Sequence, residues 1–356
     1  MIKVLRVALV LLVLGVSAFM PAPPASAQEN DRLSITTSPL PISLVTKPGQ
    51  RVATDLRVRT DGPENETLQI TLLKFSANNN LGQPRLAERE PGDDFFDWVT
   101  FSEERFTTEP NVWKTIRMTI DVPDTAGLGY YYAVAFTRAG DSPESAGGAA
   151  VDGGAATLVL LDVRTPNSKR EVQVVEFSGK RRVYEFLPAQ FTVSVRNTGN
   201  IHLVPSGEIF IKKGDELLGN IKVNQTDGNV LPGSQRVFTV IWNDGWPSYQ
   251  PKEEDGQVIN DKDGNPQTSL RWDGLKLSGL RIGKYTADLL MVYDDGERDV
   301  PLEATLSFWV IPWRILGVIL LAAGLIGFAV FIILRKVWRG LRKITKKKTP
   351  GQPSAP

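Results

Sequence analysis

The side chains that could carry out catalysis are few and far apart. The chain has one histidine, His202, and no cysteine. A serine–histidine–acid triad, or a zinc site with histidine ligands, would therefore depend on His202 alone, and the HExxH pattern is absent. His202 follows an Asn-Thr-Gly-Asn turn and begins a strand-like segment. This position favours a structural role at a turn or an edge strand.

Two groups of acidic residues offer the paired carboxylates that a glycoside hydrolase requires. They are Asp93, Asp94 and Asp97, and Glu253, Glu254 and Asp255. Such an enzyme needs two carboxyl groups on opposite sides of a sugar-binding cleft. Because both groups lie in loop-like sequence with no pattern that would position them, we interpret them as solvated loop charges.

One further segment has the composition of a metal-binding loop. Residues 261–265 (DKDGN) superficially resemble a calcium loop, but they lack the glycine and the closing glutamate of an EF-hand. Asp-Gly-Asn is also an ordinary hairpin turn. No glycine-rich phosphate loop follows a strand and opens a helix. We therefore predict no enzyme activity, no metal and no cofactor.

Aromatic residues give a stronger indication of binding than of catalysis. Residues 242–249 (WNDGWPSY) lead into a polar insertion that ends near Trp272. Aromatic side chains on a loop bury much area at little cost in entropy, which suits them to stack on sugars or to anchor a partner. We interpret Trp242 and Trp272 as core residues that flank a hairpin. Trp246 and Tyr249 are then the exposed candidates for partner binding.

The elements that must position these side chains are short strands. Alternating apolar and polar runs separated by turn residues recur along the chain, which has 31 Gly and 24 Pro. This pattern predicts an all-β fold of two tandem immunoglobulin-like β-sandwiches. We place them at residues 28–166 and 167–312, with an insertion at residues 243–273 in the second. Without cysteine, their stability must come from packed cores.

Both ends of the chain have targeting patterns. Residues 1–27 have a basic start, an apolar run and an Ala-Ser-Ala ending, typical of a signal peptide cleaved before Gln28. Residues 313–334 are long and apolar enough for a transmembrane helix that crosses the bilayer once. The basic residues of the tail, 335–356, predict a cytoplasmic C-terminus and an extracytoplasmic ectodomain.

The charge of the ectodomain excludes one class of partner. Of the 41 basic residues, two precede residue 28 and eight follow residue 334, whereas all 40 acidic residues lie between them. Residues 28–334 therefore have a net charge of −9. Because nucleic-acid binding requires a basic surface, we expect no nucleic-acid partner.

Several turn and strand motifs resemble those of a known family. In the first predicted sandwich they are Ser38-Pro-Leu-Pro41, Lys47-Pro-Gly49, Asp97-Trp-Val-Thr100, Val122-Pro-Asp-Thr-Ala-Gly127 and Gly129-Tyr-Tyr-Tyr-Ala-Val134. In the second they are Arg196-Asn-Thr-Gly-Asn200, His202-Leu-Val-Pro-Ser-Gly207, Val230-Leu-Pro-Gly-Ser234 and Phe308-Trp-Val-Ile-Pro312. Over nearly its whole length the chain resembles the bacterial WxL-interacting surface proteins. The resemblance implies a first module associated with peptidoglycan and a second that engages a surface partner with a WxL domain.

Taken together, these patterns indicate a non-enzymatic, single-pass protein of the cell membrane that binds the cell wall or another surface protein. The alternative is an assembly factor similar to pilus chaperones, in which an edge strand of the first sandwich accepts a strand from an exported partner. The alternative predicts a long unpaired edge in the first sandwich and a basic residue that anchors a carboxylate. A surface hydrolase is a third hypothesis, which the single histidine and the absence of cysteine disfavour.

Overall fold

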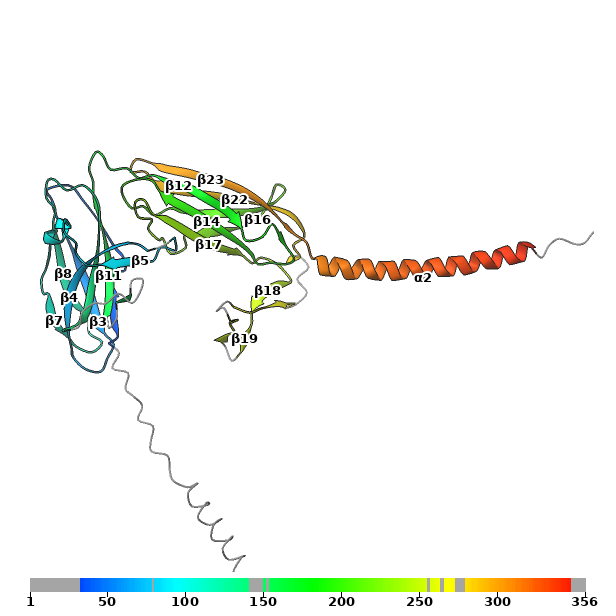
Figure 1. Cartoon of the computed structure of the whole chain (residues 1–356), viewed down its shortest axis with the longest axis horizontal. Helices are drawn as coiled ribbons and strands as arrows, with labels where there is room; N and C mark the ends of the chain where they lie inside the picture. The colour runs from blue at the N-terminus through cyan, green and yellow to red at the C-terminus, as the bar shows by residue number, and fades with distance from the viewer. Residues whose placement is uncertain are drawn as a thin grey trace, which may run out of the picture.

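The computed structural model describes residues 33–78, 80–140, 150–151, 154–254, 257–262, 266–272 and 279–346. Within these ranges the chain is mostly β-structure followed by one α-helix (Figure 1). The all-β prediction is therefore confirmed at the level of a mostly β chain with a C-terminal apolar helix. The predicted signal peptide and residues 263–265 of the calcium-like loop lie outside the described residues.

The first group of strands, which we call the first β-unit, lies between residues 35 and 163. Its strands are β1 Ile35–Ser38, β2 Ile42–Thr46, β3 Arg51–Thr60, β4 Glu66–Ala77, β5 Pro84–Ala87, β6 Val99–Phe101, β7 Arg105–Thr108, β8 Lys114–Asp121, β9 Leu128–Arg138, β10 Ala150–Val151 and β11 Gly154–Val163. A 3-10 helix, η1, lies at Asp94–Trp98. One sheet has the order β1-β3-β8-β6. The other has the order β10-β11-β9-β4-β5, with β2 on β11 and β7 on β4.

Apolar residues at alternate strand positions form the core of this unit. Ile116, Met118 and Ile120 occupy every second position of β8 and are fully buried, because alternate side chains of a strand point to the same face. They pack against residues of the opposite sheet, among them Phe136 and Leu161. The two sheets therefore enclose one hydrophobic core.

Short strands cover parts of the edges of the first β-unit. β2 runs parallel to β11 and covers its outer edge at residues 159–163, and β10 covers residues 154–155. The other outer strands, β1, β5, β6 and β7, have three or four residues each. β1 pairs only with residues 57–60 of β3, so residues 51–56 of β3 have no strand partner on that side in the described structure. The unpaired edge that the assembly-factor alternative places in the first sandwich is therefore limited to this part of β3.

The second group of strands, the second β-unit, lies between residues 172 and 310. Its main strands are β12 Val172–Gly179, β13 Val183–Tyr184, β14 Ala189–Asn197, β15 Ser206–Lys213, β16 Glu216–Val223, β17 Gln235–Trp242, β22 Gly283–Asp294 and β23 Asp299–Val310. They form the sheets β12-β14-β17 and β13-β23-β22-β15-β16. Buried aromatic rings fill the space between these sheets, with Phe308 in contact with Tyr184, Phe191, Trp242 and Tyr285.

The predicted insertion forms an extension of the second β-unit. β18 Ser248–Pro251 pairs with β21 Thr268–Arg271, and β19 Glu253–Glu254 pairs with β20 Gln257–Val258. Figure 1 shows this extension projecting from the end of the unit that is nearest to the helix, on the side of β17. We call it the hairpin extension.

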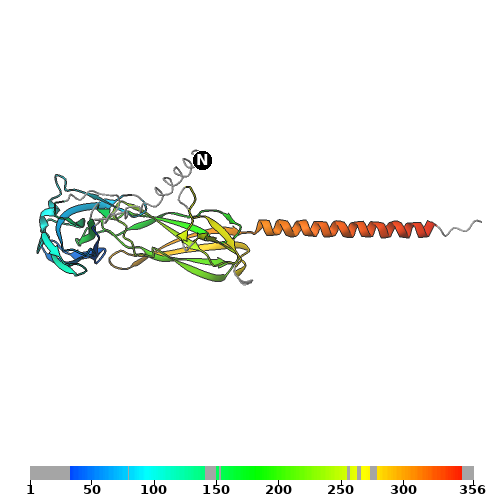
Figure 2. The same ribbon diagram turned by 90° about the horizontal axis from the view of Figure 1, so that it is seen from below.

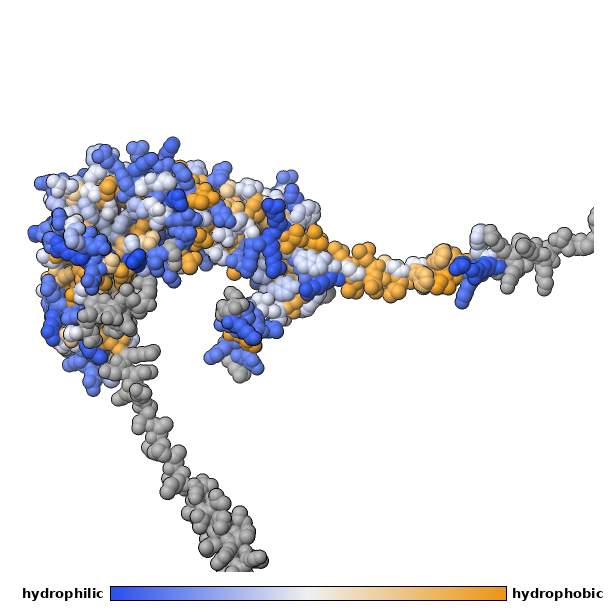
Figure 3. Space-filling view, viewed as in Figure 1, coloured by the Kyte–Doolittle hydropathy of each residue, from blue (hydrophilic) through white to orange (hydrophobic). Residues whose placement is uncertain are grey.

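The helix α2, Trp313–Lys346, is the part of the described chain that is long and apolar enough to cross a membrane. This segment, Trp313–Arg339, has a mean hydropathy of 2.9 in its most apolar window, and none of that window is buried. Near the start of the helix, Arg314 forms an ion pair with Glu185 at 3.5 Å. The helix extends beyond the predicted residues 313–334 into the basic tail. Its surface is apolar until hydrophilic residues appear near its end (Figure 3). Figure 2 shows that α2 continues the long axis of the second β-unit.

Candidate functional site: the cleft between the two β-units

The aromatic residues predicted to bind a partner lie at the base of the hairpin extension. Trp246 packs edge-on against Trp272 at 5.5 Å between ring centroids, and Phe186 lies 6.3 Å from both Trp272 and Tyr249. Trp246 and Tyr249 are half-buried and not exposed as predicted, whereas Trp272 is 52% exposed. The assignment of Trp272 to the core is therefore wrong, because the hairpin projects away from the unit. Trp242 is a core residue as predicted. Partner binding by Trp246 and Tyr249 stays a prediction.

Acidic residues that were considered for catalysis are paired with basic side chains. Among the acidic residues, Asp93 pairs with Lys74 at 2.7 Å, and Asp97 forms an ion pair with Arg89. Hydrogen bonds from these basic side chains hold the pKa of each carboxyl below its usual range. No group of three histidine, aspartate or glutamate residues in the described ranges is placed to hold a metal ion. Asp93 and Asp97 are therefore each paired with a basic side chain.

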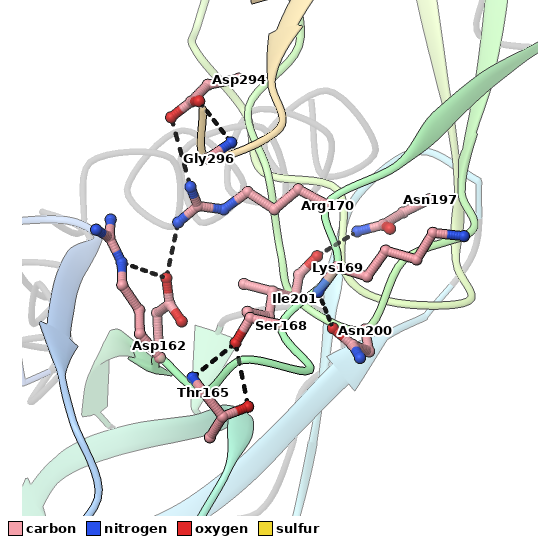
Figure 4. Close-up of polar contacts among 11 residues, drawn as sticks. Asp162, Thr165, Ser168, Lys169, Arg170, Asn197, Asn200, Ile201, Asp294 and Gly296 are labelled. Carbon is pink, nitrogen blue, oxygen red and sulfur yellow. Dashed lines mark hydrogen bonds and ion pairs between the residues drawn. The ribbon is translucent and has the colours of Figure 1, made fainter. Parts of the chain in front are cut away.

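A buried ion pair joins the two β-units (Figure 4). Arg170 donates from Nη2 to Oδ2 of Asp162, the penultimate residue of β11, at 2.8 Å. Its Nη1 reaches Oδ2 of Asp294, in the second β-unit, at 3.4 Å. The side chain of Asp162 is only 2% exposed and that of Arg170 is 15% exposed. We call this arrangement the interdomain joint.

The connecting segment of the joint is itself fixed by hydrogen bonds (Figure 4). The N–H of Thr165 donates to Oγ of Ser168 at 2.9 Å, and the N–H of Lys169 donates to Oδ1 of Asn200 at 2.7 Å. Because β11 ends at Val163 and β12 begins at Val172, these bonds span the predicted boundary between residues 166 and 167. The connection is a bonded turn, which restricts rotation of one unit relative to the other.

His202 also belongs to this contact. Its ring packs edge-on against Tyr131 of the first β-unit at 5.7 Å, and its Nδ1 is sealed from solvent without a hydrogen-bond partner in the described structure. Burial lowers the pKa of His202, an effect that Arg170 reinforces and Asp162 opposes. The predicted turn residue is thus an interdomain contact.

We expect acidification to loosen this contact. Because the folded pKa of His202 lies below its ordinary value of about 6.5, the unfolded chain binds the proton first. The contribution of neutral His202 to the free energy of unfolding is complete above about pH 6.5. It is lost as the pH falls through the folded pKa, by at most about 1.4 kcal/mol per pH unit. Thermal unfolding between about pH 7 and 5 measures it, with His202→Phe as the variant that no longer titrates. An equal loss of stability in both proteins would contradict the prediction.

The turn between β4 and β5 lies against β17. The carbonyl oxygen of Asn80 accepts a hydrogen bond from the N–H of Val237. Beside this contact, between the two β-units, lies a cavity of about 150 Å³, which we call the cleft. The residues of the first β-unit that line the cavity are mostly apolar, and those of the second are mostly polar. The principal lining residues are Pro41, Phe75, Leu158, Leu160, Leu231, Asp227, Asn229 and Arg236.

Arg236 is the unusual member of this lining. Its Nη1 donates to the carbonyl oxygen of Asn229 at 2.7 Å, and its guanidinium lies 5.6 Å from the ring of Phe238. No carboxylate pairs with it among the residues that the structure describes. Burial lowers the pKa of Arg236, although the side chain remains cationic.

Two glycines lie close to the guanidinium of Arg236. A Cβ atom at Gly82 of the first β-unit would lie 2.5 Å from Cζ of Arg236, and one at Gly228 would lie 2.2 Å from its Nη2. Gly82 also has a φ of +76°, which other residues rarely adopt. The guanidinium is therefore held between the two units, with an apolar wall beside it. Such a site suits a carboxylate next to an apolar side chain.

An open strand edge continues from this cleft. The N–H of Val237 points away from β14 toward Asn80, so the backbone groups of Thr239 and Ile241 face the same side, because residues two apart share an edge. No described strand pairs with β17 there. The side chain of Ile241 is 55% exposed. The second β-unit thus has an open edge beside the cleft, with outward-facing backbone groups at Thr239 and Ile241.

Comparison with known proteins gave structures but no family. No family model matches the chain, and no curated protein matches it. Solved structures similar to it include the class 5 fimbriae chaperone CfaA, 12% identical with a TM-score of 0.36, where the match covers 76% of this chain and 98% of the other. The Pseudomonas aeruginosa CupB2 chaperone is 10% identical with a TM-score of 0.32, covering 77% and 100%. The E. coli chaperone DraB is 12% identical with a TM-score of 0.31, covering 77% and 98%. Likeness at this level does not assign a function.

Proposed function

We propose that this chain is a single-pass membrane protein whose β-units bind, without catalysis, an extended segment of another exported protein. In this proposal residues 1–27 are a cleaved signal peptide, the β-units are immunoglobulin-like sandwiches outside the cytoplasm, and the basic tail lies inside. The observation that supports the proposal is Arg236, a partly buried cation without an acidic partner in the described structure, beside an apolar cavity and an open strand edge.

The chemistry of the ligand follows from these three features. An extended peptide pairs its main chain with the edge of β17, which supplies affinity, and places alternate side chains toward the cleft. An apolar side chain fits against Phe75 and Leu158, and a carboxylate bonds to Arg236. Asp227, which also lines the cavity, is paired with Lys222 at 3.3 Å. The site therefore combines strand addition with charge recognition, as an assembly factor for exported subunits requires.

Replacing Arg236 with glutamine should weaken peptide binding by about 10- to 100-fold, because a charge-assisted hydrogen bond contributes about 1.5–3 kcal/mol. The full chain in lipid nanodiscs is tested against a library of peptides with either a free carboxylate or an amide at the C-terminus. We expect selection of peptides that combine a carboxylate with alternating apolar residues.

The matched control for this experiment is Arg57→Gln, which removes an exposed arginine of β3 and should leave binding unchanged. Equal binding of acid and amide peptides that contain no other carboxylate would refute the assignment of Arg236. So would equal affinity of the Arg236→Gln variant and the original chain.

A second candidate function is binding of the cell wall or of a surface protein. The exposed Trp272, packed against Trp246 on the hairpin extension, favours it, because exposed aromatic rings stack on sugars and anchor partners. On the basis of the resemblance to WxL-interacting proteins, we propose peptidoglycan and a protein with a WxL domain as the ligands. Enrichment on purified peptidoglycan without selection of any peptide would favour this function over the first.

A further inference from the structure

At the end of the second β-unit nearest to α2, exposed basic residues gather around β13, β23 and β22, while the exposed Asp215 and Glu216 follow β15 on the other side of the sheet. Lys180, Arg181 and Arg182 form the loop between β12 and β13, and Lys284 lies at the start of β22. All four are exposed. None of them has a carboxylate partner within the described ranges, although the chain between residues 28 and 334 has an excess of acidic residues.

Exposed apolar residues lie among these basic side chains. In the sheet, Trp309 of β23 pairs with Val183 on one side and with Lys284 on the other, so the three side chains share one face. Trp309 is 45% exposed and Val183 is 42% exposed. Tryptophan beside lysine and arginine is the composition that proteins use at the boundary between membrane and water. We call Lys180, Arg181, Arg182, Val183, Lys284 and Trp309 the membrane-proximal face.

The position of this face follows from its short connection to the helix. Only Ile311 and Pro312 separate β23 from α2, and the N–H of Ile311 donates to the carbonyl oxygen of Tyr184 at 2.8 Å. Trp309 therefore lies no more than about 13 Å along the chain from Trp313, where the helix begins. The headgroup layer extends about 5–8 Å beyond the hydrocarbon core. The long basic side chains can bridge the remaining distance.

We propose that the membrane-proximal face docks on the anionic lipid headgroups of the bilayer that α2 crosses. Lys180, Arg181 and Arg182 bind phosphate groups, while Trp309 and Val183 enter the interfacial layer. Docking fixes the tilt of the second β-unit above the membrane and so sets the direction in which the cleft opens. The proposal rests on α2 being a transmembrane helix, and it is independent of what the cleft binds.

The absence of cysteine allows a direct test. Val183→Cys, labelled with an environment-sensitive dye, reports on this face alone, and Val112→Cys, at an exposed position of the first β-unit, is the control. The full chain is reconstituted in nanodiscs of phosphatidylcholine with or without phosphatidylglycerol. We expect a blue shift of the emission at position 183 in the anionic discs, reversed by high salt, and no shift at position 112.

A charge-reversal variant separates lipid binding from simple proximity. Lys180→Glu, Arg181→Glu and Arg182→Glu together should reduce the ratio of docked to undocked protein by about 100-fold or more. Reversal of three exposed residues of the first β-unit, Lys47, Arg57 and Arg85, should have no effect. Circular dichroism of each variant confirms that it folds.

Three results would overturn the proposal. The first is an emission at position 183 that does not depend on phosphatidylglycerol, and the second is an unchanged shift in the charge-reversal variant. The third is failure of the chain to enter nanodiscs, which would also refute the transmembrane assignment of α2. Peptide binding at the cleft is measured separately in the Arg236→Gln comparison, so failure of one proposal is distinguishable from failure of the other.

Discussion

Replacing Arg170 with methionine should lower the free energy of unfolding by about 3–5 kcal/mol, because it leaves Asp162 as a buried charge without its main partner. The side chain of Asp162 is 2% exposed, and its Oδ1 already has no hydrogen-bond partner in the described structure. Arg164, at 3.7 Å, is the remaining cation near it and is itself half exposed. Denaturant unfolding of the full chain in detergent or nanodiscs measures the change.

The control for this prediction is an ion pair on the surface. Arg51 pairs with Asp121, with side chains 71% and 48% exposed, and such pairs contribute about 0–1 kcal/mol. Arg51→Met should therefore have little effect. The double variant Asp162→Leu with Arg170→Met removes both charges and should recover much of the stability. A loss in Arg170→Met no greater than that in Arg51→Met would show that the joint is not a buried electrostatic contact.

Proline at position 239 should abolish strand addition at β17, with a loss of affinity of about 100-fold or more, because it removes an edge donor and obstructs pairing in register. The N–H of Thr239 faces the open edge and not β14, so the substitution removes no bond within the sheet. Proline is tolerated on edge strands for this reason. Peptide binding to the full chain measures the effect.

Thr239→Ala is the matched variant, since it removes the side chain and keeps the backbone donor. It should bind peptides as the original chain does, and thermal unfolding should show that both variants fold. If Thr239→Pro bound peptides as tightly as Thr239→Ala, main-chain pairing at this edge would be excluded.

The sequence could predict those parts of the fold that depend on local pattern. Alternation in segments such as Ile116 to Ile120 indicates strands with one buried face, and the structure buries these residues. The apolar run from Ile315 to Leu334 indicates a helix because no charge or proline interrupts it. In both cases residues that are close together in the sequence determine the secondary structure.

The cleft could not be predicted, because it depends on contacts between distant segments. Only folding brings Gly82 and Gly228 to the two sides of Arg236. One signal was present: Arg236 stands two residues before Phe238, so an arginine occupies the inward-facing register of an amphipathic strand. The exposure of Trp272 was missed for a similar reason, since a tryptophan at the end of a polar insertion has the same local sequence whether the hairpin folds back or projects.

The two-residue connection between β23 and α2 determines how the protein would respond to a mechanical load. A force that pulls on a partner bound in the cleft would be transmitted through the second β-unit to α2, which continues the long axis of that unit (Figure 2). β23 pairs with β22 in register from Asp299 to Val310, so a pull along the strand shears all of these hydrogen bonds together and does not open them one at a time. In the proposed topology, with α2 across the bilayer, such a force would reach the bilayer through the paired strands β22 and β23.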